Sequence, residues 1–355
     1  MKKSLLAGGI AVLVLTAALV LWIGYRFRPS VPEPTTPAPP ERVNPPASVT
    51  PPASTQKLRV ALVLSGAPGD QAFVDLVLAG LERAGKDLGI EVRKSFTPKP
   101  TDWEPELKAA VAEGYGLIIA GDSHMKYALG NIARAYPDAR FIMLGDTLNI
   151  PNVLSVGLDE GEGAFLAGAL AAMVTSDRDD KSANAEKVVG WVGGPENAAS
   201  RKILSAYKQG ALYIDKQARV LGEFSGSFGE PAEGREAAVR QLAARAGVIT
   251  TYARGTNPGV IAAVKGAGKK AILGEPARPD KDESILASVV LAVDDVVYDI
   301  IRTAASGKLE TGKTVIYGLS TGHIRVIMNG VPPRMKARVD EISEKIKKRE
   351  IPIQD

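Results

Sequence analysis

An aromatic residue in a glycine-rich turn is the first feature that points to chemistry. In EFSGSFGEPAEGREAAVRQL, residues 223–242, Phe228 lies between two glycines, after an apolar run and before a helix start. A side chain there cannot easily bury itself in its own element, so it needs a loop, a partner or a ligand to lie against. A ring stacked on a base can contribute about 1–3 kcal/mol. Phe228 is therefore a candidate for stacking on a planar ligand, and the alternative is that it only closes its loop against the rest of the fold.

A second glycine-containing loop, YARGTNPG at residues 252–259, offers further contacts. Gly255 would let the backbone come close to a ligand, and Arg254 could meet an anionic or carbonyl group. The alternative is a loop with a solvated arginine. His124 follows the apolar run LIIAG, but a lone histidine is more often a satisfied loop residue than a ligand contact.

The residue inventory argues against an enzyme. Cysteine is absent, which excludes disulfides, cysteine nucleophiles and thiolate metal sites. The two histidines, His124 and His323, are too few for a histidine-rich metal site. No Ser/His/Asp arrangement and no phosphate-binding loop with its lysine are visible. We therefore expect no catalysis, no metal and no cofactor. The net charge of +4, from 44 basic and 40 acidic residues, is too balanced to indicate nucleic-acid binding.

Alternating apolar runs and amphipathic stretches must position these residues. From Leu58 onward, runs such as LRVALVLSG, GLIIAG, KVVGWVGG and ILASVV alternate with helical patterns such as QAFVDLVLAGLERAGKDLG. Continuous Val/Ile/Leu strands between helices indicate parallel sheets that are covered on both faces. We expect two doubly wound α/β lobes, and a single closed (β/α)₈ barrel is the main alternative. In open α/β sheets, ligands bind outside the carboxyl ends of the strands.

The N-terminal residues 1–28 predict a membrane segment. Two lysines precede an uncharged apolar run at residues 5–25, which is about the length needed to span a bilayer as a helix. Trp22 and Tyr25 lie at the end of this run and two arginines follow it, as is typical of a membrane interface. We expect an uncleaved anchor, and a cleaved signal peptide is the alternative. Without cysteine, a lipoprotein anchor is excluded.

A proline-rich segment, residues 29–56, comes next. Ten of the 24 prolines of the chain lie between Pro29 and Pro52. Such a sequence has no apolar set to bury and predicts an extended stalk, rising about 3.1 Å per residue in polyproline II. The alternative is a disordered linker without a required length. The folded part is expected to begin near Lys57.

Longer stretches resemble a known family. They are NVLSVGLDEGEGAFLAGALAAMVT, KVVGWVGGPENAASRKILSAYKQGALYIDKQARVLGEFSGSFGEPAEG, ARGTNPGVIAAV and ILASVVLAVDDVVYDIIRTAASGKLETGKTVIYGL. They are similar to the basic membrane protein (BMP) family, the purine nucleoside receptor-like solute-binding proteins of bacterial ABC transporters, and follow the family order from about residue 58 to 328. The resemblance implies a periplasmic-binding-protein type I fold, with two lobes and a hinged cleft that closes on a small ligand. STGHIRVIM and the following helix also resemble the membrane-attached competence regulator of this family.

The resemblance suggests a division of the folded chain. Residues 57–157 with about 285–312 would form lobe 1, and residues 158–284 with about 313–330 would form lobe 2. Residues 331–355 would form a C-terminal helix and tail. The apolar residues that share one face of this helix are Met335, Val339, Ile342 and Ile346.

The resemblance also implies a ligand-binding set. Asp70 and Phe73 match acidic and aromatic positions of the family, and Phe228 matches its stacking phenylalanine. Gly255 lies in the family's glycine loop, and Glu275 takes the place of a ribose-binding aspartate.

Four positions depart from the nucleoside-receptor pattern, and the first is Glu275, whose carboxylate is longer than that of the aspartate it replaces. Tyr127, which we include in the ligand-binding set, stands where the receptors have an aspartate for the base edge. Val74 replaces an asparagine. Leu291 replaces a lysine, which removes a cation and up to three hydrogen-bond donors. These changes favour a less polar or differently decorated ligand, or a site that has lost its ligand.

Two functions follow from these patterns. The first is a membrane-tethered extracytoplasmic solute-binding protein that takes a nucleoside-like small molecule to an ABC permease. It would be attached to the cell membrane by a single N-terminal anchor. The second is a regulatory or sensory BMP-family protein that does not transport and whose ligand site is altered or lost.

Overall fold

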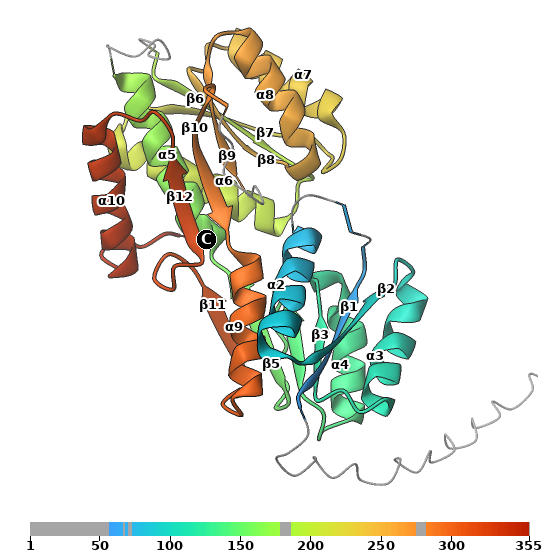
Figure 1. The fold of residues 1–355 in the computed structure, drawn as a ribbon. Helices are drawn as coiled ribbons and strands as arrows, with labels where there is room; N and C mark the ends of the chain where they lie inside the picture. Colours follow the sequence, from blue (N-terminus) through green and yellow to red (C-terminus); the bar gives the residue numbers. More distant parts are fainter. Residues whose placement is uncertain (1–56, 67, 70–72, 178–185, 275–281, 355) are drawn as a thin grey trace, which may run out of the picture. The chain divides into compact units, whose positions relative to one another are not determined.

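The computed structural model describes residues 57–66, 68–69, 73–177, 186–274 and 282–354 (Figure 1). The expected membrane anchor at residues 1–28 and the proline-rich segment at residues 29–56 lie outside these ranges, as do Asp70 and Glu275. Among the helices of the described ranges, none is both long enough and apolar enough to cross a bilayer.

The described chain forms two open six-stranded sheets. The first sheet has the order β11-β5-β4-β3-β1-β2 and is parallel throughout; its strands are β1 (Arg59–Leu64), β2 (Glu91–Phe96), β3 (Leu117–Ala120), β4 (Phe141–Leu144), β5 (Val153–Leu158) and β11 (Lys313–Tyr317). The second has the order β12-β10-β9-β8-β6-β7; its strands are β6 (Val188–Gly193), β7 (Arg219–Phe224), β8 (Val248–Tyr252), β9 (Lys270–Gly274), β10 (Ile285–Leu291) and β12 (Ile324–Met328). Only the β10–β12 pair of these ladders is antiparallel. Two open sheets confirm the expected two-lobed α/β fold and exclude the closed barrel.

Helices cover both faces of the first sheet. Alternate residues of β1 point to opposite sides, so Ala61 and Val63 lie in one core and Leu62 in another. The first core includes residues of α3 (Trp103–Ala112) and α4 (Lys126–Ala135). The second includes α2 (Phe73–Leu88) and α9 (Val293–Ala305), which pack closely because Gly80 has no side chain. A Cβ at Gly80 would lie 2.5 Å from the Asp294 carbonyl oxygen.

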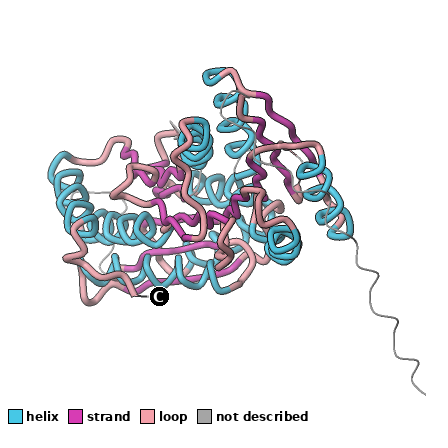
Figure 2. Tube along the Cα trace, turned by 90° about the horizontal axis from the view of Figure 1, so that it is seen from below, coloured by secondary structure: helices cyan, strands magenta, loops and turns pink. Residues whose placement is uncertain are grey.

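The second sheet is covered in the same way. On one face lie α5 (Glu160–Ser176), α6 (Ala198–Ile214) and α10 (Pro333–Lys347), and on the other α7 (Pro231–Ala243) and α8 (Asn257–Gly266). Figure 2 shows helices on either side of the strands. The apolar face of α10 packs toward α5, and its four predicted residues, Met335, Val339, Ile342 and Ile346, are buried.

The chain crosses between the sheets three times, after β5, after β10 and between β11 and β12. The strand membership corrects the expected division at two places. Residues 285–291 form β10 in the second sheet, because they continue its parallel ladder beside β9. Residues 313–317 form β11 in the first sheet, because they pair with β5.

The crossing segments are bonded to one another. The amide of Asp159, after β5, donates to the Tyr317 carbonyl at 2.9 Å. The amide of Ala292, after β10, donates to the carbonyl of His323 at 2.8 Å. These bonds join all three crossings into one connected region.

Candidate ligand-binding site

Three loops meet at the carboxyl end of the second sheet. Strand β6 lies between β7 and β8 in the sheet, so the loops that follow these strands are neighbours. They carry Gly194 after β6, Phe228 after β7, and Arg254 and Gly255 after β8. The sheet order thus brings together two residues of the predicted set, Phe228 and Gly255.

Phe228 lies directly against the backbone of the other two loops. A Cβ at Gly194 would lie 2.2 Å from the Cε1 atom of the Phe228 ring, so the ring occupies the space that any larger residue would need. A Cβ at Gly255 would lie 2.8 Å from the Phe228 carbonyl oxygen. Both glycines are therefore needed for Phe228 to lie this close to the other two loops.

A positively charged side chain also lies against the ring of Phe228. The guanidinium carbon of Arg254 lies 4.7 Å from the ring centroid, which is cation–π geometry. Phe228 nevertheless remains 37% exposed. The side chain is thus held by its neighbours without being part of the hydrophobic core.

Hydrogen bonds from Thr256 tie the β7 loop to the β8 loop. The buried Thr256 hydroxyl donates to the Ser227 carbonyl at 3.1 Å and accepts from the Glu230 amide at 3.2 Å. One side chain therefore binds the backbone on both sides of Phe228.

The β8 loop has its own internal support in Asn257, the first residue of α8. Its Oδ1 atom accepts hydrogen bonds from the Thr251 hydroxyl at 2.6 Å and the Ala253 amide at 2.9 Å. These bonds fix the entry into the short 3-10 turn η3 (Arg254–Thr256). Arg254 has φ +49°, the left-handed region, which costs a non-glycine residue about 1–2 kcal/mol. Such conformations persist where the surroundings impose them, and they cluster at binding and catalytic sites.

An aromatic cluster closes the strand ends before these loops. The Trp191 ring lies 6.4 Å from Tyr252, nearly parallel to it, and 5.4 Å from Phe224, edge-on. Phe224 and Tyr252 are the last residues of β7 and β8. The three loops are therefore supported by packed aromatic side chains.

The carboxyl end of the first sheet is more polar than that of the second sheet. The carboxylate of Asp122 accepts from the Ser65 amide and the His124 amide, both at 3.0 Å, and thereby joins the loops after β1 and β3. The exposed His124 ring places Nδ1 at 3.1 Å from the same carboxylate. Lys126 pairs with Asp146 at 2.8 Å. Across the described residues, no group of three or more His, Asp or Glu side chains is placed to hold a metal ion.

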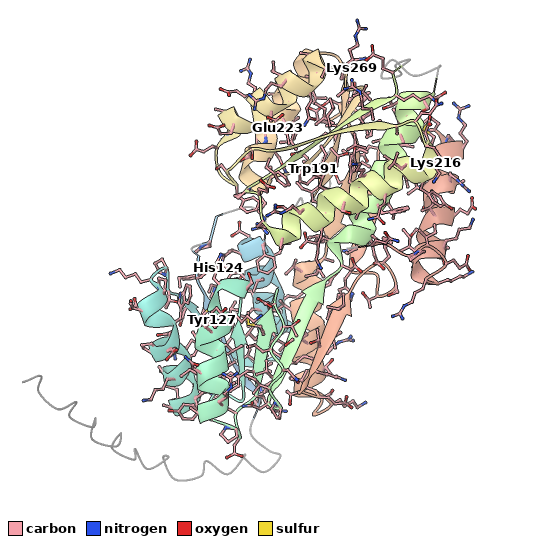
Figure 3. The ribbon with its side chains drawn as sticks, turned by 180° about the vertical axis from the view of Figure 1, so that it is seen from behind. His124, Tyr127, Trp191, Lys216, Glu223 and Lys269 are labelled. Carbon is pink, nitrogen blue, oxygen red and sulfur yellow. The ribbon has the colours of Figure 1, made fainter. Side chains whose placement is uncertain are left out.

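Of the predicted residues in the first lobe, the structure describes Phe73 and Tyr127, and neither is seen to join Phe228. Phe73 begins α2 and packs, partly buried, against the large core. Tyr127 lies in the first turn of α4 and is 84% exposed (Figure 3). It lines a pocket of about 510 Å³ whose residues are Pro100, Thr101, Trp103, Glu104, Pro105, His124, Tyr127 and Ala128.

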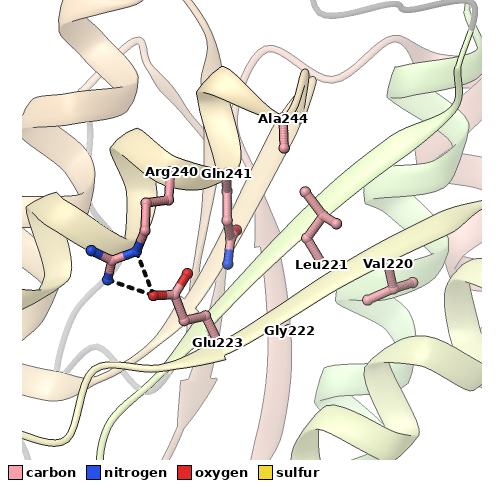
Figure 4. A pocket seen from close by; sticks show the side chains of 7 residues that line it. All are labelled: Val220, Leu221, Gly222, Glu223, Arg240, Gln241 and Ala244. Atoms are coloured by element: carbon pink, nitrogen blue, oxygen red, sulfur yellow. Dashed lines mark hydrogen bonds and ion pairs between the residues drawn. The ribbon is translucent and has the colours of Figure 1, made fainter.

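A second pocket of about 370 Å³ lies between β7 and α7 (Figure 4). An ion pair of 2.5 Å between Glu223 and Arg240 lies beside it, and Gln241 donates to the Trp191 carbonyl at 2.8 Å. Phe228 lines neither this pocket nor the one beside Tyr127.

Sequence reasoning missed Gly194, Thr256 and Asn257. The paired glycines of VGG and the polar residues after Gly255 were visible signals. Their roles, however, depend on contacts between loops that are distant along the chain. Among the departures noted above, Leu291 is buried, and Val74 is partly buried at the start of α2.

Named relatives cover most of this chain. An uncharacterized lipoprotein of Pyrococcus abyssi is 28% identical over 72% of this chain and 66% of its own length. The ABC transporter nucleoside-binding protein BmpA of Lactococcus lactis is 23% identical over 81% of this chain and 88% of its own length.

Solved structures show the same fold. A solute-binding protein of an ABC transporter system from Aeropyrum pernix superposes with a TM-score of 0.71 at 22% identity, covering 83% of this chain and 92% of that one. A transcriptional activator of the comK gene from Bacillus halodurans gives a TM-score of 0.70 at 18% identity, covering 82% of this chain and 99% of that one.

The family model that describes PnrA-like ABC transporter substrate-binding proteins, Bmp, matches residues 57–355. This match spans the two sheets and the C-terminal helix. The chain therefore belongs to the Bmp family of PnrA-like ABC transporter substrate-binding proteins.

Proposed function

We propose that this protein is a membrane-tethered extracytoplasmic receptor that binds a nucleoside-like planar solute and delivers it to an ABC permease. Family membership supports solute binding and a permease partner. The relative from Lactococcus lactis that is named as nucleoside-binding supports a planar ligand.

The observation that carries the proposal is the setting of Phe228. Its ring is partly exposed, lies at the carboxyl end of a parallel sheet, and is positioned by Gly194 and Gly255. This edge of an open α/β sheet is where ligands bind. A large aromatic residue held in place but left partly exposed is suited to stack on a flat ligand.

The remaining members of the predicted set complete the proposed site. Phe73 and Tyr127 would contribute from the first lobe, Asp70 from the loop after β1, and Glu275 from the loop after β9. We propose that the two lobes close on the solute between these residues.

The tether is proposed from the sequence. The relative from Pyrococcus abyssi that is named as a lipoprotein supports attachment to a membrane. This chain has no cysteine to carry a lipid. Its apolar run at residues 5–25 would therefore act as the anchor, and residues 29–56 as the stalk.

The test is a thermal-shift screen of the full-length protein in detergent against nucleosides and bases. Specific binding raises the apparent stability by mass action. Phe228→Leu keeps an apolar side chain but removes the ring face, whereas Phe228→Tyr keeps the ring. We expect a shift that Phe228→Leu abolishes and Phe228→Tyr preserves. A shift that Phe228→Leu leaves intact would remove Phe228 from the site.

A further inference from the structure

His124, close to Tyr127 in the chain, has one ring nitrogen without a hydrogen-bond partner. His124 lies in the short 3-10 turn η2 (Ser123–Met125) and Tyr127 in the first turn of α4, so both follow β3 (Figure 3). The Nδ1 atom of the imidazole lies 3.1 Å from the Asp122 carboxylate. The other ring nitrogen, Nε2, is bonded to nothing among the residues that the structure describes. Because the His124 side chain is 76% exposed, a solute can reach this atom.

The carboxylate of Asp122 decides the role of this nitrogen. An ionised carboxylate only accepts hydrogen bonds, so Nδ1 of His124 must carry the proton that is donated to Asp122. In a neutral imidazole the other nitrogen is then an acceptor. Asp122 is itself held in place, because it also accepts from the amides of Ser65 and His124, both at 3.0 Å. His124 therefore presents an oriented acceptor, Nε2.

This acceptor belongs to a pocket with aromatic walls. His124, Tyr127 and Trp103 line the same space of about 510 Å³, which is within the usual size of a small-molecule site. Trp103 is held there by its Nε1 atom, which donates to a main-chain carbonyl at 2.6 Å. Glu104 also lines the pocket, but its carboxylate already accepts from Asn131 at 2.6 Å. The pocket thus combines two aromatic side chains with an acceptor that no described protein group occupies.

We propose that His124 determines specificity, and that the solute is a planar ring whose edge carries an N–H donor. This inference rests on the proposed function, which places Tyr127 in the solute site. The ring of the solute lies against the aromatic side chains of the pocket, and its N–H group donates to Nε2 of His124.

A ring edge without an N–H group binds more weakly for a physical reason. When the solute enters, it displaces the water that bonds to Nε2 of His124. A C–H or N–CH₃ group in place of N–H gives no hydrogen bond in return. A neutral hydrogen bond of ordinary strength corresponds to about fivefold in affinity. We therefore expect the N–H member of a matched pair to bind about fivefold more tightly than the member that lacks it.

The experiment is isothermal titration calorimetry on the full-length protein in detergent at pH 8, with three matched pairs of nucleosides. The pairs are adenosine and purine riboside, cytidine and pyrimidin-2-one riboside, and uridine and 3-methyluridine. The second member of each pair lacks the N–H donor on the edge of its base. His124→Leu removes the acceptor, whereas His124→Gln keeps an acceptor on a side chain of similar reach. Glu104→Gln is the matched control, because it neutralises the carboxylate of the same pocket.

The expected result is a change in preference rather than a general loss of binding. Wild type and Glu104→Gln should favour the N–H member of at least one pair about fivefold. His124→Leu should bind both members of that pair equally, and His124→Gln should retain part of the preference. A purely structural role of His124 would instead weaken both members alike.

Nitrogen-15 NMR of the imidazole rings checks the hydrogen-bonding role directly. The chain has only two histidines, so the spectrum of His124→Leu assigns the signals of His124. In the wild type at pH 8 the proton should be on Nδ1, and the preferred nucleoside should shift the signal of Nε2. A proton on Nε2 in the free protein would contradict the proposed acceptor.

Two failures are distinguishable. Equal affinity for both members of every pair in the wild type, or a preference that survives in His124→Leu or is lost in Glu104→Gln, would overturn this inference and leave the proposed function standing. Absence of binding by all six nucleosides would count against both.

Discussion

The main-chain amide of Leu319 donates a 2.6 Å hydrogen bond to the carboxylate of Glu162. This bond ties the β11–β12 crossing to the first turn of α5, which itself follows the β5 crossing. Burial raises the pKa of Glu162 above its ordinary value of 4.5, and nearby Asp159 raises it further. The Leu319 amide and Lys347 act in the opposite direction, and burial outweighs them. A partly buried carboxylate therefore lies where the lobes are joined.

Replacing Glu162 with glutamine should change how stability depends on pH. Because the folded-state pKa is raised, the native protein binds more protons than the unfolded chain between pH 4.5 and the raised value. Wild type should lose stability as pH rises through this window, and Glu162→Gln should not. Urea unfolding from pH 4 to pH 8 measures the difference. A difference between the two proteins that stays constant with pH would contradict the assignment.

Close packing of α5 against α6 should make two glycines irreplaceable. A Cβ at Gly168 would lie 2.0 Å from the Tyr207 carbonyl oxygen, and one at Gly210 would lie 1.9 Å from that of Phe165. Either change to alanine forces backbones apart, so we expect a loss of about 1–3 kcal/mol in the free energy of unfolding. Gly266→Ala is the control, because no atom lies within 4 Å of the added Cβ. That control should be neutral or slightly stabilising in the same denaturation assay.

Moving the Phe228 ring should abolish binding without unfolding the protein. Gly194→Ala places a methyl group 2.2 Å from the ring, which must turn away. The ring is partly exposed, so the stability cost should be below about 1 kcal/mol. Gly229→Ala, next to Phe228 but with open space around its Cβ, should keep the ligand-induced thermal shift. If both variants respond equally to ligand, the ring position does not matter.

The loop that carries Arg254 should depend on Asn257. In Asn257→Ala, the buried Ala253 amide and the Thr251 hydroxyl lose their acceptor, which costs about 1–3 kcal/mol of stability. Asn257→Asp keeps an acceptor at the start of α8, so it should lose less. Chemical denaturation compares the two variants. Equal losses would show that the carbonyl oxygen of Asn257 is not what matters.

The overall fold could be predicted because its strands are continuous apolar runs. Both faces of each sheet are covered, so β1 and β3 appear in the sequence as LRVALVLSG and GLIIAG. The sheet membership of residues 285–291 was not predictable in the same way. Their apolar pattern suits either sheet, and only pairing with β9 decides the outcome.

The candidate site was predictable only where one loop carried the signal. Phe228 and Gly255 stand out because each lies in a glycine-containing turn. The stacking of Arg254 on Phe228 joins the loops after β7 and β8. These two loops are close to each other because both strands are neighbours of β6 in the sheet. Such a contact depends on strand order, which local sequence does not contain.

Strand β11 is translated long after its partner β5, and this order has a consequence for biosynthesis. Strand β5 gains its outer neighbour only from residues 313–317, and the second sheet gains its antiparallel edge from residues 324–328. Translation proceeds at about 5–20 residues per second, so β5 leaves the ribosome roughly 10–30 s before its partner. During this interval the nascent chain presents an open strand edge, which invites pairing with other chains. Nearly the whole polypeptide must therefore be translated before either lobe is complete.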